Sequence, residues 1–456
     1  MGIFGTDGIR GVANADLTPE RAFAIGRAAA SVLAQLAGRR DHLVLGRDTR
    51  CSGTMLEAAM VAGITSVGLD VALIGIVPTP AVACVTVRDH AIAGVMISAS
   101  HNPVPDNGIK FFGADGFKLT DAQEHEIEAR LEASDLPRPI GAQIGVASIA
   151  HALGRHYHRS LRSQAVDLHG LEIVVDGAYG SAYAVAPYVL RALGARVHEL
   201  HCEPDGSRIN VGCGATDLRS LQRAVLEKKS TRVIGVAFDG DADRALFVDE
   251  RGEIVTGDHV LYILARDLAS RGELGEPAVV GTVMSNLGLE RALAAESIGL
   301  LRAPVGDRYV LERMRGAGLV LGAERSGHVI DLRYNTTGDG PMTAVSLLGV
   351  MARTGATLQE LAVPLVEAPQ ILINVRVHAE NLLDDAQVQA AIAAAQRELD
   401  GAGRLLIRPS GTEPLLRVMV EGPERAQVEA LAASVAAAIE SADQRASERR
   451  RSRQRR

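Results

Sequence analysis

Three aspartates, Asp239, Asp241 and Asp243, alternate in the run DGDADR, directly after the apolar residues 233–238. In an extended chain alternate side chains point to the same side, whereas on a helix this spacing would rotate each by about 200° from the last. Three converging carboxylates repel one another, and a hard divalent cation such as Mg²⁺ removes that cost. The pattern predicts one Mg²⁺ ion per chain at this loop.

A calcium-binding loop and a solvated acidic turn are the two alternatives for these aspartates. Glu250 lies where the bidentate glutamate of a calcium loop would fall. However, Arg244 occupies the position that needs glycine in such a loop, and residues 245–248 resemble a strand rather than a flanking helix. The sequence therefore favours a catalytic metal site over a calcium loop.

Ser100 lies in the segment ISASHNPVPDNGIKFF, just beyond a predicted strand at residues 93–97. Ligands of α/β sheets usually bind at this carboxyl edge. The surroundings do not match G-x-S-x-G, which disfavours an acyl-transfer hydrolase. Next to a metal loop, a phosphorylated Ser100 would offer oxygen ligands and nearly two negative charges to Mg²⁺. Asn107 and Gly108 predict a turn, and Lys110 on the next strand lies within reach of a transferring phosphoryl group.

Two further polar clusters lie near residues 325 and 410. The first, GAERSGH, presents Glu324, Ser326 and His328 in a glycine-bounded loop that suits recognition of sugar hydroxyls, although a lone histidine is more often structural. The second, RPSGTEP, joins a guanidinium, hydroxyls and a flexible backbone, which suits either a phosphate nest or a surface turn. Its phosphate-binding candidates are Arg408, Ser410, Gly411, Thr412 and, on the following strand, Arg417. Together the clusters indicate metal-assisted phosphoryl transfer on a phosphorylated sugar.

Helices and strands alternate along most of the chain. Thr18 and Pro19 begin a helix that Gly38 ends, and apolar strands are expected at residues 42–46, 71–77 and 93–97. Strands without polar alternation, interleaved with helices, indicate mostly parallel sheets covered on both faces. The pattern repeats, with strands at 171–175, 196–200, 233–238 and 278–282 and a helix at 182–193. After residue 371 it changes to strands at 371–377 and 417–420 with helices at 385–398 and 424–440.

We therefore predict three related α/β domains with mixed or parallel sheets and a smaller C-terminal α+β domain, arranged around a central cleft. The expected boundaries are residues 1–148, 149–252, 253–366 and 367–443, with a basic, disordered tail at 444–456.

The charge and residue composition of the chain argue against some kinds of binding partner. The net charge is −7, and the tail from Gln444 to Arg456 carries +6, which leaves −13 for the rest of the chain. An acidic body and a lack of tryptophan argue against nucleic-acid binding. The four cysteines show no metal-binding spacing, and no signal peptide is evident. Glycine and prolines interrupt the apolar residues 71–87, which argues against a membrane-spanning helix there. We expect a cytoplasmic protein with reduced thiols that binds no membrane.

The motifs together resemble the α-D-phosphohexomutase superfamily over about residues 2–422. The resemblance rests on SASHNP, DGDADR, GAERSGH and RPSGTEP, and on GIFGTDGIRG, PDGSRINVGCG, TVMSNLGLE, VGDRYV and TTGDG, which favour its amino-sugar branch. It departs from that branch at Ala323 and Arg325 in the sugar loop, and at Ala215 and Asp217.

The resemblance implies that Ser100 carries the phosphate and binds Mg²⁺ together with the three aspartates. It also implies that Glu324 and Ser326 bind the sugar, that residues 408–412 bind the non-transferring phosphate, and that catalytic residues line the centre. These central residues are Arg10, His101, Lys110, Arg244 and His328. A phosphorylated amino sugar is the expected substrate, a sugar 1,6-bisphosphate the activator, and a homodimer one possible assembly. A hexose-phosphate mutase and a catalytically silent sugar-phosphate-binding protein remain as alternatives.

Overall fold

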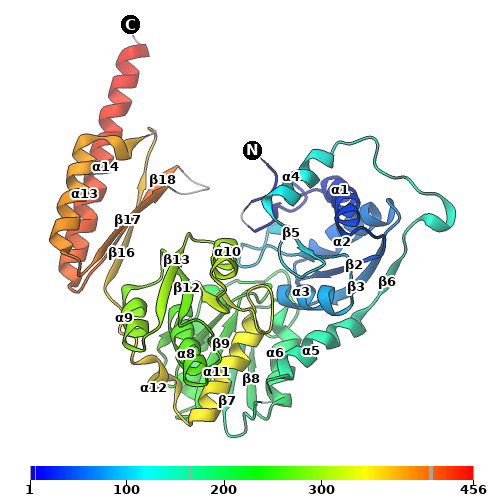
Figure 1. Cartoon of the computed structure of the whole chain (residues 1–456), viewed down its shortest axis with the longest axis horizontal. Helices are drawn as coiled ribbons and strands as arrows, with labels where there is room; N and C mark the ends of the chain where they lie inside the picture. The colour runs from blue at the N-terminus through cyan, green and yellow to red at the C-terminus, as the bar shows by residue number, and fades with distance from the viewer. Residues whose placement is uncertain (1, 6, 165, 380, 410–413, 455–456) are drawn as a thin grey trace. The chain divides into compact units, whose positions relative to one another are not determined.

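The computed structural model describes residues 2–5, 7–164, 166–379, 381–409 and 414–454. The chain divides into two compact units, one of residues 1–284 with 296–364 and one of residues 285–295 with 365–456. The first unit contains three sheets and the second contains one (Figure 1). The three sheets of the first unit carry most of the candidate site residues.

The first sheet has six strands in the order β1-β5-β4-β2-β3-β6. Its strands are β1 (Ile9–Val12), β2 (His42–Arg47), β3 (Asp70–Ile76), β4 (Ala93–Ile97), β5 (Asp106–Gly113) and β6 (Ala147–Ile149). β4, β2, β3 and β6 are parallel, while at one edge β5 pairs antiparallel to β4 and β1 pairs antiparallel to β5. Helices α1 (Pro19–Ala37) and α2 (Gly53–Thr65) pack together over one face and α3 (Thr79–Arg88) packs on the other, with α4 (Asp121–Arg130) beside α1.

Helix α1 begins and ends where the sequence predicts. The Thr18 side chain accepts a hydrogen bond from the Arg21 backbone N–H, and Gly38 takes the left-handed conformation that closes the helix, with φ at 64°. The buried residues of this helix recur on one face, which packs into the core of the first sheet.

The second sheet has the order β11-β10-β9-β7-β8, in which β8, β7 and β9 are parallel. Its elements are α5 (Arg155–Arg162), β7 (Glu172–Asp176), α6 (Ala182–Ala192), β8 (Arg196–Leu200), α7 (Arg219–Glu227), β9 (Val233–Phe238), β10 (Ala245–Val248) and β11 (Ile254–Val255). Strand β10 runs antiparallel to β9, so the chain reverses immediately after Phe238. This reversal holds the three aspartates in a tight loop. It also places a strand where a calcium-binding motif would need a helix.

The third sheet has the order β13-β12-β14-β15. Its elements are α8 (Gly257–Ser270), β12 (Ala278–Thr282), β13 (Gly299–Ala303), α10 (Asp307–Ala317), β14 (Leu321–Ala323), β15 (Val329–Asp331), α11 (Gly340–Thr354) and α12 (Leu358–Ala362). Apolar residues of α10 and of strands β12, β13 and β15 form one core. The turn between β14 and β15 carries the predicted sugar loop.

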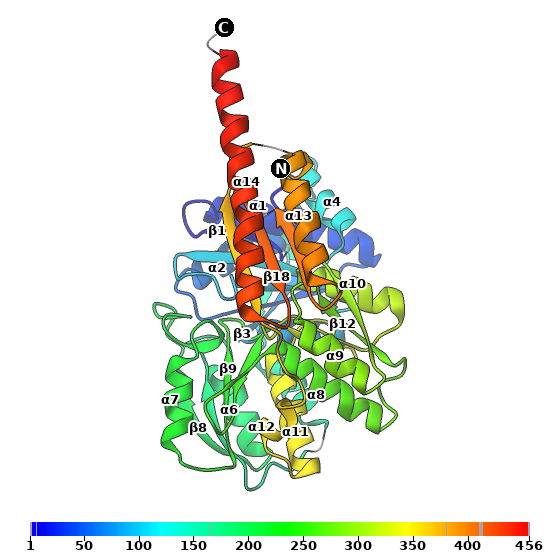
Figure 2. The same cartoon turned by 90° about the vertical axis from the view of Figure 1, so that its left-hand side faces the viewer.

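The second unit is an antiparallel sheet, β16-β18-β17, covered on one face by two helices (Figure 2). Its elements are α9 (Leu287–Ala295), β16 (Gln370–Arg376), α13 (Ala386–Leu399), β17 (Arg404–Pro409), β18 (Leu415–Glu421) and α14 (Arg425–Gln454). Arg404 pairs with the fully buried Glu421 and also donates to the Ser285 carbonyl at 2.9 Å, which ties the segment 285–295 to this sheet. Contacts group residues 285–295 with this sheet, and the domain boundaries stay a prediction.

The sequence and the structure differ at two more places. Residues 444–454 continue helix α14, where we predicted a disordered tail, because alanine, glutamate, glutamine and arginine all favour helix and extend one that is already nucleated. Asn107 and Gly108 lie inside strand β5 rather than in a turn, since both pair with β1. The other predicted strands and helices named above are confirmed, with ends that move by a few residues.

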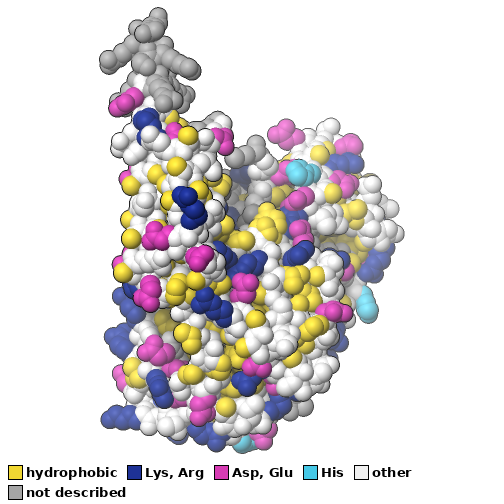
Figure 3. Space-filling model, turned by 60° about the vertical axis from the view of Figure 1, so that its left-hand side comes forward, with side chains coloured by type: hydrophobic (Ala, Val, Ile, Leu, Met, Phe, Trp, Pro, Cys, Tyr) yellow, Lys and Arg dark blue, Asp and Glu magenta, His cyan; other side chains and the backbone are white. Residues whose placement is uncertain are grey.

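Acidic and basic side chains are interspersed with hydrophobic ones on the face of the molecule that Figure 3 shows. None of the described helices combines the length and the apolar character needed to span a membrane. The absence of nucleic-acid and membrane partners stays a prediction.

Candidate active site

The loop between β9 and β10 gathers the three aspartates. All three are buried, and one carboxylate oxygen from each lies within 4.8 Å of the others. Burial, together with the two neighbouring carboxylates, raises the pKa of Asp239 well above its usual value. The Oδ1 atoms of Asp241 and Asp243 are buried without a hydrogen-bond partner among the described residues. A set of oxygen donors with unused, converging lone pairs fits Mg²⁺.

Ser100 directly adjoins this loop, as the resemblance implies. Its Oγ donates a hydrogen bond of 2.5 Å to Asp239 Oδ2, and only 1% of the residue is exposed. Gly240 makes this approach possible, because a Cβ at position 240 would lie 2.6 Å from the Ser100 carbonyl oxygen. His101 Nδ1 lies 3.2 Å from the Ser100 Oγ, and burial with the nearby Arg244 and Arg10 lowers the pKa of His101 to about 4.

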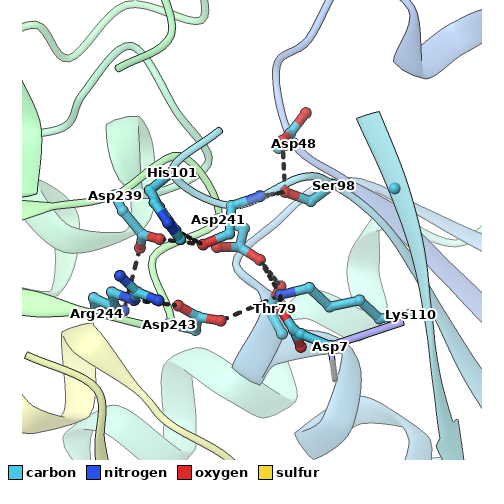
Figure 4. Close-up of polar contacts among 12 residues, drawn as sticks. Asp7, Asp48, Thr79, Ser98, His101, Lys110, Asp239, Asp241, Asp243 and Arg244 are labelled. Atoms are coloured by element: carbon cyan, nitrogen blue, oxygen red, sulfur yellow. Dashed lines mark hydrogen bonds and ion pairs between the residues drawn. The ribbon is translucent and has the colours of Figure 1, made fainter. Parts of the chain in front are cut away.

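Lys110 extends from β5 into the same carboxylates (Figure 4). Its Nζ lies 2.8 Å from Asp241 Oδ2, 3.2 Å from Asp243 Oδ2 and 2.9 Å from Asp7 Oδ2. Although burial opposes its charge, these three carboxylates raise the pKa of Lys110 well above the usual lysine value. Lys110 is therefore a fixed cation at neutral pH, suited to neutralising phosphoryl oxygens rather than to accepting a proton.

Arg10 is oriented by two neighbours, Asp7 and Asn102, that were not predicted as site residues. It pairs with Asp7 at 2.5 Å and donates to Asn102 Oδ1 at 2.8 Å, next to the serine loop. Asp7 also pairs with Lys118. Asp7 and Lys118 belong to GTDGIRG and GADGFKL, two glycine-containing segments. That pattern gave no means of telling them from surface charges.

Arg244 and His328 enclose the other side of the metal loop. Their backbones form an isolated antiparallel bridge, and the Arg244 N–H donates to Asp239 Oδ1 at 3.2 Å. His328 Nδ1 lies 3.6 Å from Asp243 Oδ1. Although burial opposes its charge, Asp243 raises the pKa of His328. The close packing needs glycine at 338, where a Cβ would lie 2.3 Å from the His328 ring.

The predicted sugar loop lies in the same unit, just before His328. Glu324 is 8% exposed and accepts a hydrogen bond of 2.9 Å from the Gly306 backbone N–H, which leaves its second oxygen available to hydroxyls. Ser326 is half-buried in the turn that follows. Arg325, one of the two departures in this loop, has its Nη1 3.5 Å from Asp258 Oδ2.

Arg408 and Arg417 are directly opposite each other on the paired strands β17 and β18 of the second unit. Partial burial and the neighbouring Arg417 lower the pKa of Arg408. Two arginines at opposite positions of paired strands favour an anion beside them. Ser410, Gly411 and Thr412 lie outside the described residues.

Several buried polar residues that support the site were not predicted. Thr79, at the start of α3, donates from its Oγ1 to Asp241 Oδ2 at 2.6 Å, so it fixes one metal-loop carboxylate. Ser98 donates to Asp48 Oδ2 at 2.7 Å and accepts from the Ser100 N–H at 2.9 Å. The position of Asp48 at the carboxyl end of β2 was the available signal, because that edge is where ligands bind.

We expect Asp241→Asn to weaken Mg²⁺ binding about tenfold, because it removes one of three converging charges and leaves Lys110 without part of its counter-charge. Glu250→Gln is the matched control, since Glu250 would be a ligand only in a calcium loop. Calorimetric Mg²⁺ titration of both variants checks this. If Asp241→Asn and the wild type bind Mg²⁺ with equal affinity, or if the wild type is fully active in excess chelator, the aspartate loop is not a metal site that the reaction needs.

Four family models match the chain in order. They are described as phosphoglucomutase/phosphomannomutase alpha/beta/alpha domains I, II and III, at residues 1–138, 155–252 and 256–368, and the C-terminal domain at 372–438. The chain is 52% identical over 437 residues to a phosphoglucosamine mutase of Moorella thermoacetica, covering 95% of this chain and 98% of the relative. It is 51% identical over 438 residues to that of Symbiobacterium thermophilum, with the same coverage.

Solved structures give the same fold. A phosphoglucomutase/phosphomannomutase family protein from Burkholderia thailandensis superposes with a TM-score of 0.81 at 26% identity, covering 96% of this chain and 97% of that one. The N-acetylphosphoglucosamine mutase of Aspergillus fumigatus, in complex with GlcNAc-6P and magnesium, superposes with a TM-score of 0.69 at 19% identity, covering 97% and 96%. The second likeness supports the fold alone.

Proposed function

Because this chain belongs to the phosphoglucomutase/phosphomannomutase family, and within it to the phosphoglucosamine mutases, we propose that it interconverts glucosamine 6-phosphate and glucosamine 1-phosphate. The observation that carries the proposal is the contact of Ser100 with the aspartate loop, 2.5 Å from Oγ to Asp239 Oδ2. Glucosamine 1-phosphate would then enter the synthesis of UDP-N-acetylglucosamine, which is a precursor of the cell wall. A catalytically silent sugar-phosphate-binding protein is the second candidate, and the contact of Ser100 with three buried aspartates weighs against it.

In the first half-reaction, phosphorylated Ser100 donates its phosphoryl group to the free hydroxyl of the sugar phosphate. The bond from phosphorus to Ser100 Oγ breaks, a bond to the sugar oxygen forms, and a sugar 1,6-bisphosphate results. Ser100, Asp239, Asp241 and Asp243 would hold Mg²⁺, which would neutralise charge on the phosphoryl oxygens. Lys110 and Arg244 bring fixed positive charge to the same oxygens, and His101, 3.2 Å from Ser100 Oγ, can take the proton that the sugar hydroxyl releases.

In the second half-reaction the bisphosphate is bound in the opposite orientation and returns its other phosphoryl group to Ser100. Glu324 and Ser326 hold sugar hydroxyls in both orientations, while Arg10 and His328 complete the charged surroundings. Arg408 and Arg417, with Ser410, Gly411 and Thr412, hold the phosphate that is not being transferred. A bisphosphate that escapes leaves Ser100 unphosphorylated, so added sugar 1,6-bisphosphate is the expected activator. Cytoplasmic location and a homodimer stay predictions.

Sugar preference is the part of the proposal that needs its own test, because Ala323 and Arg325 depart from the family pattern in the sugar loop. We expect a coupled assay with a trace of sugar bisphosphate to give a kcat/KM at least about tenfold higher for glucosamine phosphate than for glucose or mannose phosphate. A higher value for either hexose phosphate would replace the proposal with a phosphoglucomutase or phosphomannomutase activity. No turnover of any of the three would favour a binding protein.

A further inference from the structure

Ser100 has a left-handed backbone conformation, with φ at 52°. A serine rarely adopts this conformation unless its surroundings stabilise it. The conformation also decides the direction of the side chain, and here Oγ points to Asp239. The groups that hold the Ser100 backbone therefore decide where its phosphate would be.

Arg50 is the first of these groups. Its guanidinium is fully buried, 1% exposed, and Nε pairs with Asp48 Oδ2 at 3.1 Å. The remaining N–H groups donate to four carbonyls of the serine loop, those of Ser100 (3.0 Å), Asn102 (2.7 Å), Pro103 (2.6 Å) and Asp106 (2.9 Å). Because a guanidinium presents its donors in one rigid plane, these bonds impose the shape of the loop.

Asn210 is the second group, and it comes from a different sheet. It lies in the loop between β8 and α7, and its Nδ2 donates to the same Ser100 carbonyl at 2.9 Å. Gly240 of the aspartate loop packs against this contact, since a Cβ there would lie 3.0 Å from Asn210 Nδ2. The Ser100 carbonyl therefore accepts one hydrogen bond from the loop after β2 and one from the loop after β8.

The loop that carries Asn210 is itself anchored at Asp176, the last residue of β7. The two Asp176 oxygens accept the backbone N–H groups of Ala178 at 2.9 Å and Gly214 at 3.0 Å, and the Ala178 carbonyl accepts from Asn210 N–H at 3.1 Å. His201 and Cys213 lie close enough to Asp176 to suggest a metal site. Because both carboxylate oxygens already serve the backbone, and burial raises the pKa of the Cys213 thiol to about 12, this cluster supports the loop instead.

We propose that Arg50 and Asn210 are positioning residues for phosphoryl transfer, which hold the Ser100 carbonyl from two sheets and so keep Oγ against the aspartate loop. The inference rests on the proposed function, because it assumes that Ser100 carries the phosphate. Without the Asn210 bond, Ser100 can relax towards an ordinary backbone conformation, and its phosphate would turn away from the sugar hydroxyl. Transfer would slow, and water would compete better for the phosphoryl group.

The test is Asn210→Gly, with Asn14→Gly as the matched control. The two asparagines have φ values of 62° and 63°, so glycine changes the backbone preference equally, and Asn14 is exposed. Each protein is phosphorylated with sugar 1,6-bisphosphate. Its kcat and KM are then measured. In a separate sample that contains no sugar substrate, hydrolysis of the phosphate on Ser100 is followed over time by intact mass. For Asn210→Gly we expect kcat to fall about thirtyfold, KM to stay within about twofold and phosphate loss to accelerate severalfold.

Asn210→Asp is the second variant, in case the glycine variant does not fold. It keeps the size of the side chain and tolerance of the left-handed conformation but loses the amide donor, so the same changes are expected. If kcat and phosphate loss in the folded variants match those of Asn14→Gly, the inference is wrong. A wild-type protein that takes up no phosphate would overturn the proposed function itself, which is a separate outcome.

Discussion

Ser100→Ala should lower kcat by at least about 10³-fold while leaving the fold intact. The variant removes the oxygen that accepts and returns the phosphoryl group, and among the described residues no other hydroxyl bonds to Asp239. A single small hydroxyl is lost from a polar loop, so the core is unchanged and the melting temperature should stay within a few degrees. Steady-state kinetics with glucosamine 6-phosphate and a thermal melt give both numbers.

Ser98→Ala is the informative comparison for that variant. Ser98 accepts the Ser100 N–H and donates to Asp48, so its loss should slow the reaction moderately without removing the phosphate carrier. If Ser98→Ala has no mutase activity while Ser100→Ala has the wild-type kcat, then Ser98 and not Ser100 carries the phosphate.

Arg408→Ala should raise KM about thirtyfold to a hundredfold and release free sugar bisphosphate into the medium. A charge-assisted contact to the non-transferring phosphate is lost, and that contact must also retain the bisphosphate between half-reactions. Arg417, directly opposite on the paired strand, would remain and preserve part of the binding. Kinetics combined with chromatography of the released bisphosphate measure the two effects.

Arg397→Ala is the matched control, because Arg397 is an exposed arginine on helix α13 of the same unit. It should leave KM and bisphosphate release as in the wild type. If Arg408→Ala behaves like this control, the loop at 408–412 is a surface turn, and the phosphate must be held at Arg10 or Lys110.

The sequence predicted those parts of the site in which several residues of one chemistry occur close together. Alternating aspartates after an apolar strand predicted the metal loop, although the structure brings them together in a turn, with Ala242 in the left-handed conformation, and not along an extended chain. Ser100, at the carboxyl edge of its sheet, was predictable from the usual place of ligands in α/β folds. The strands and helices around them followed from apolar patterning and caps such as Thr18 and Gly38.

The residues that were missed act through contacts between distant segments. Arg50, Thr79 and Asn210 carry no local signal, because each has its role only after loops that are distant in sequence come together. Asp7 and Lys118 could not be told from surface charges, because burial, not residue type, distinguishes them. Helix α14 was ended too early because a run of arginines was interpreted as a solvated tail, although arginine is a good helix former.

The central claim is that Ser100 carries the phosphoryl group, and locating the phosphate on the protein tests it most directly. Wild type and Ser100→Ala would be incubated with glucosamine 1,6-bisphosphate and Mg²⁺, measured by intact mass, and digested for phosphopeptide mapping. We predict one phosphate per wild-type chain, located on Ser100, and none on the variant. A phosphate on another residue, or equal phosphorylation of both proteins, would contradict the account.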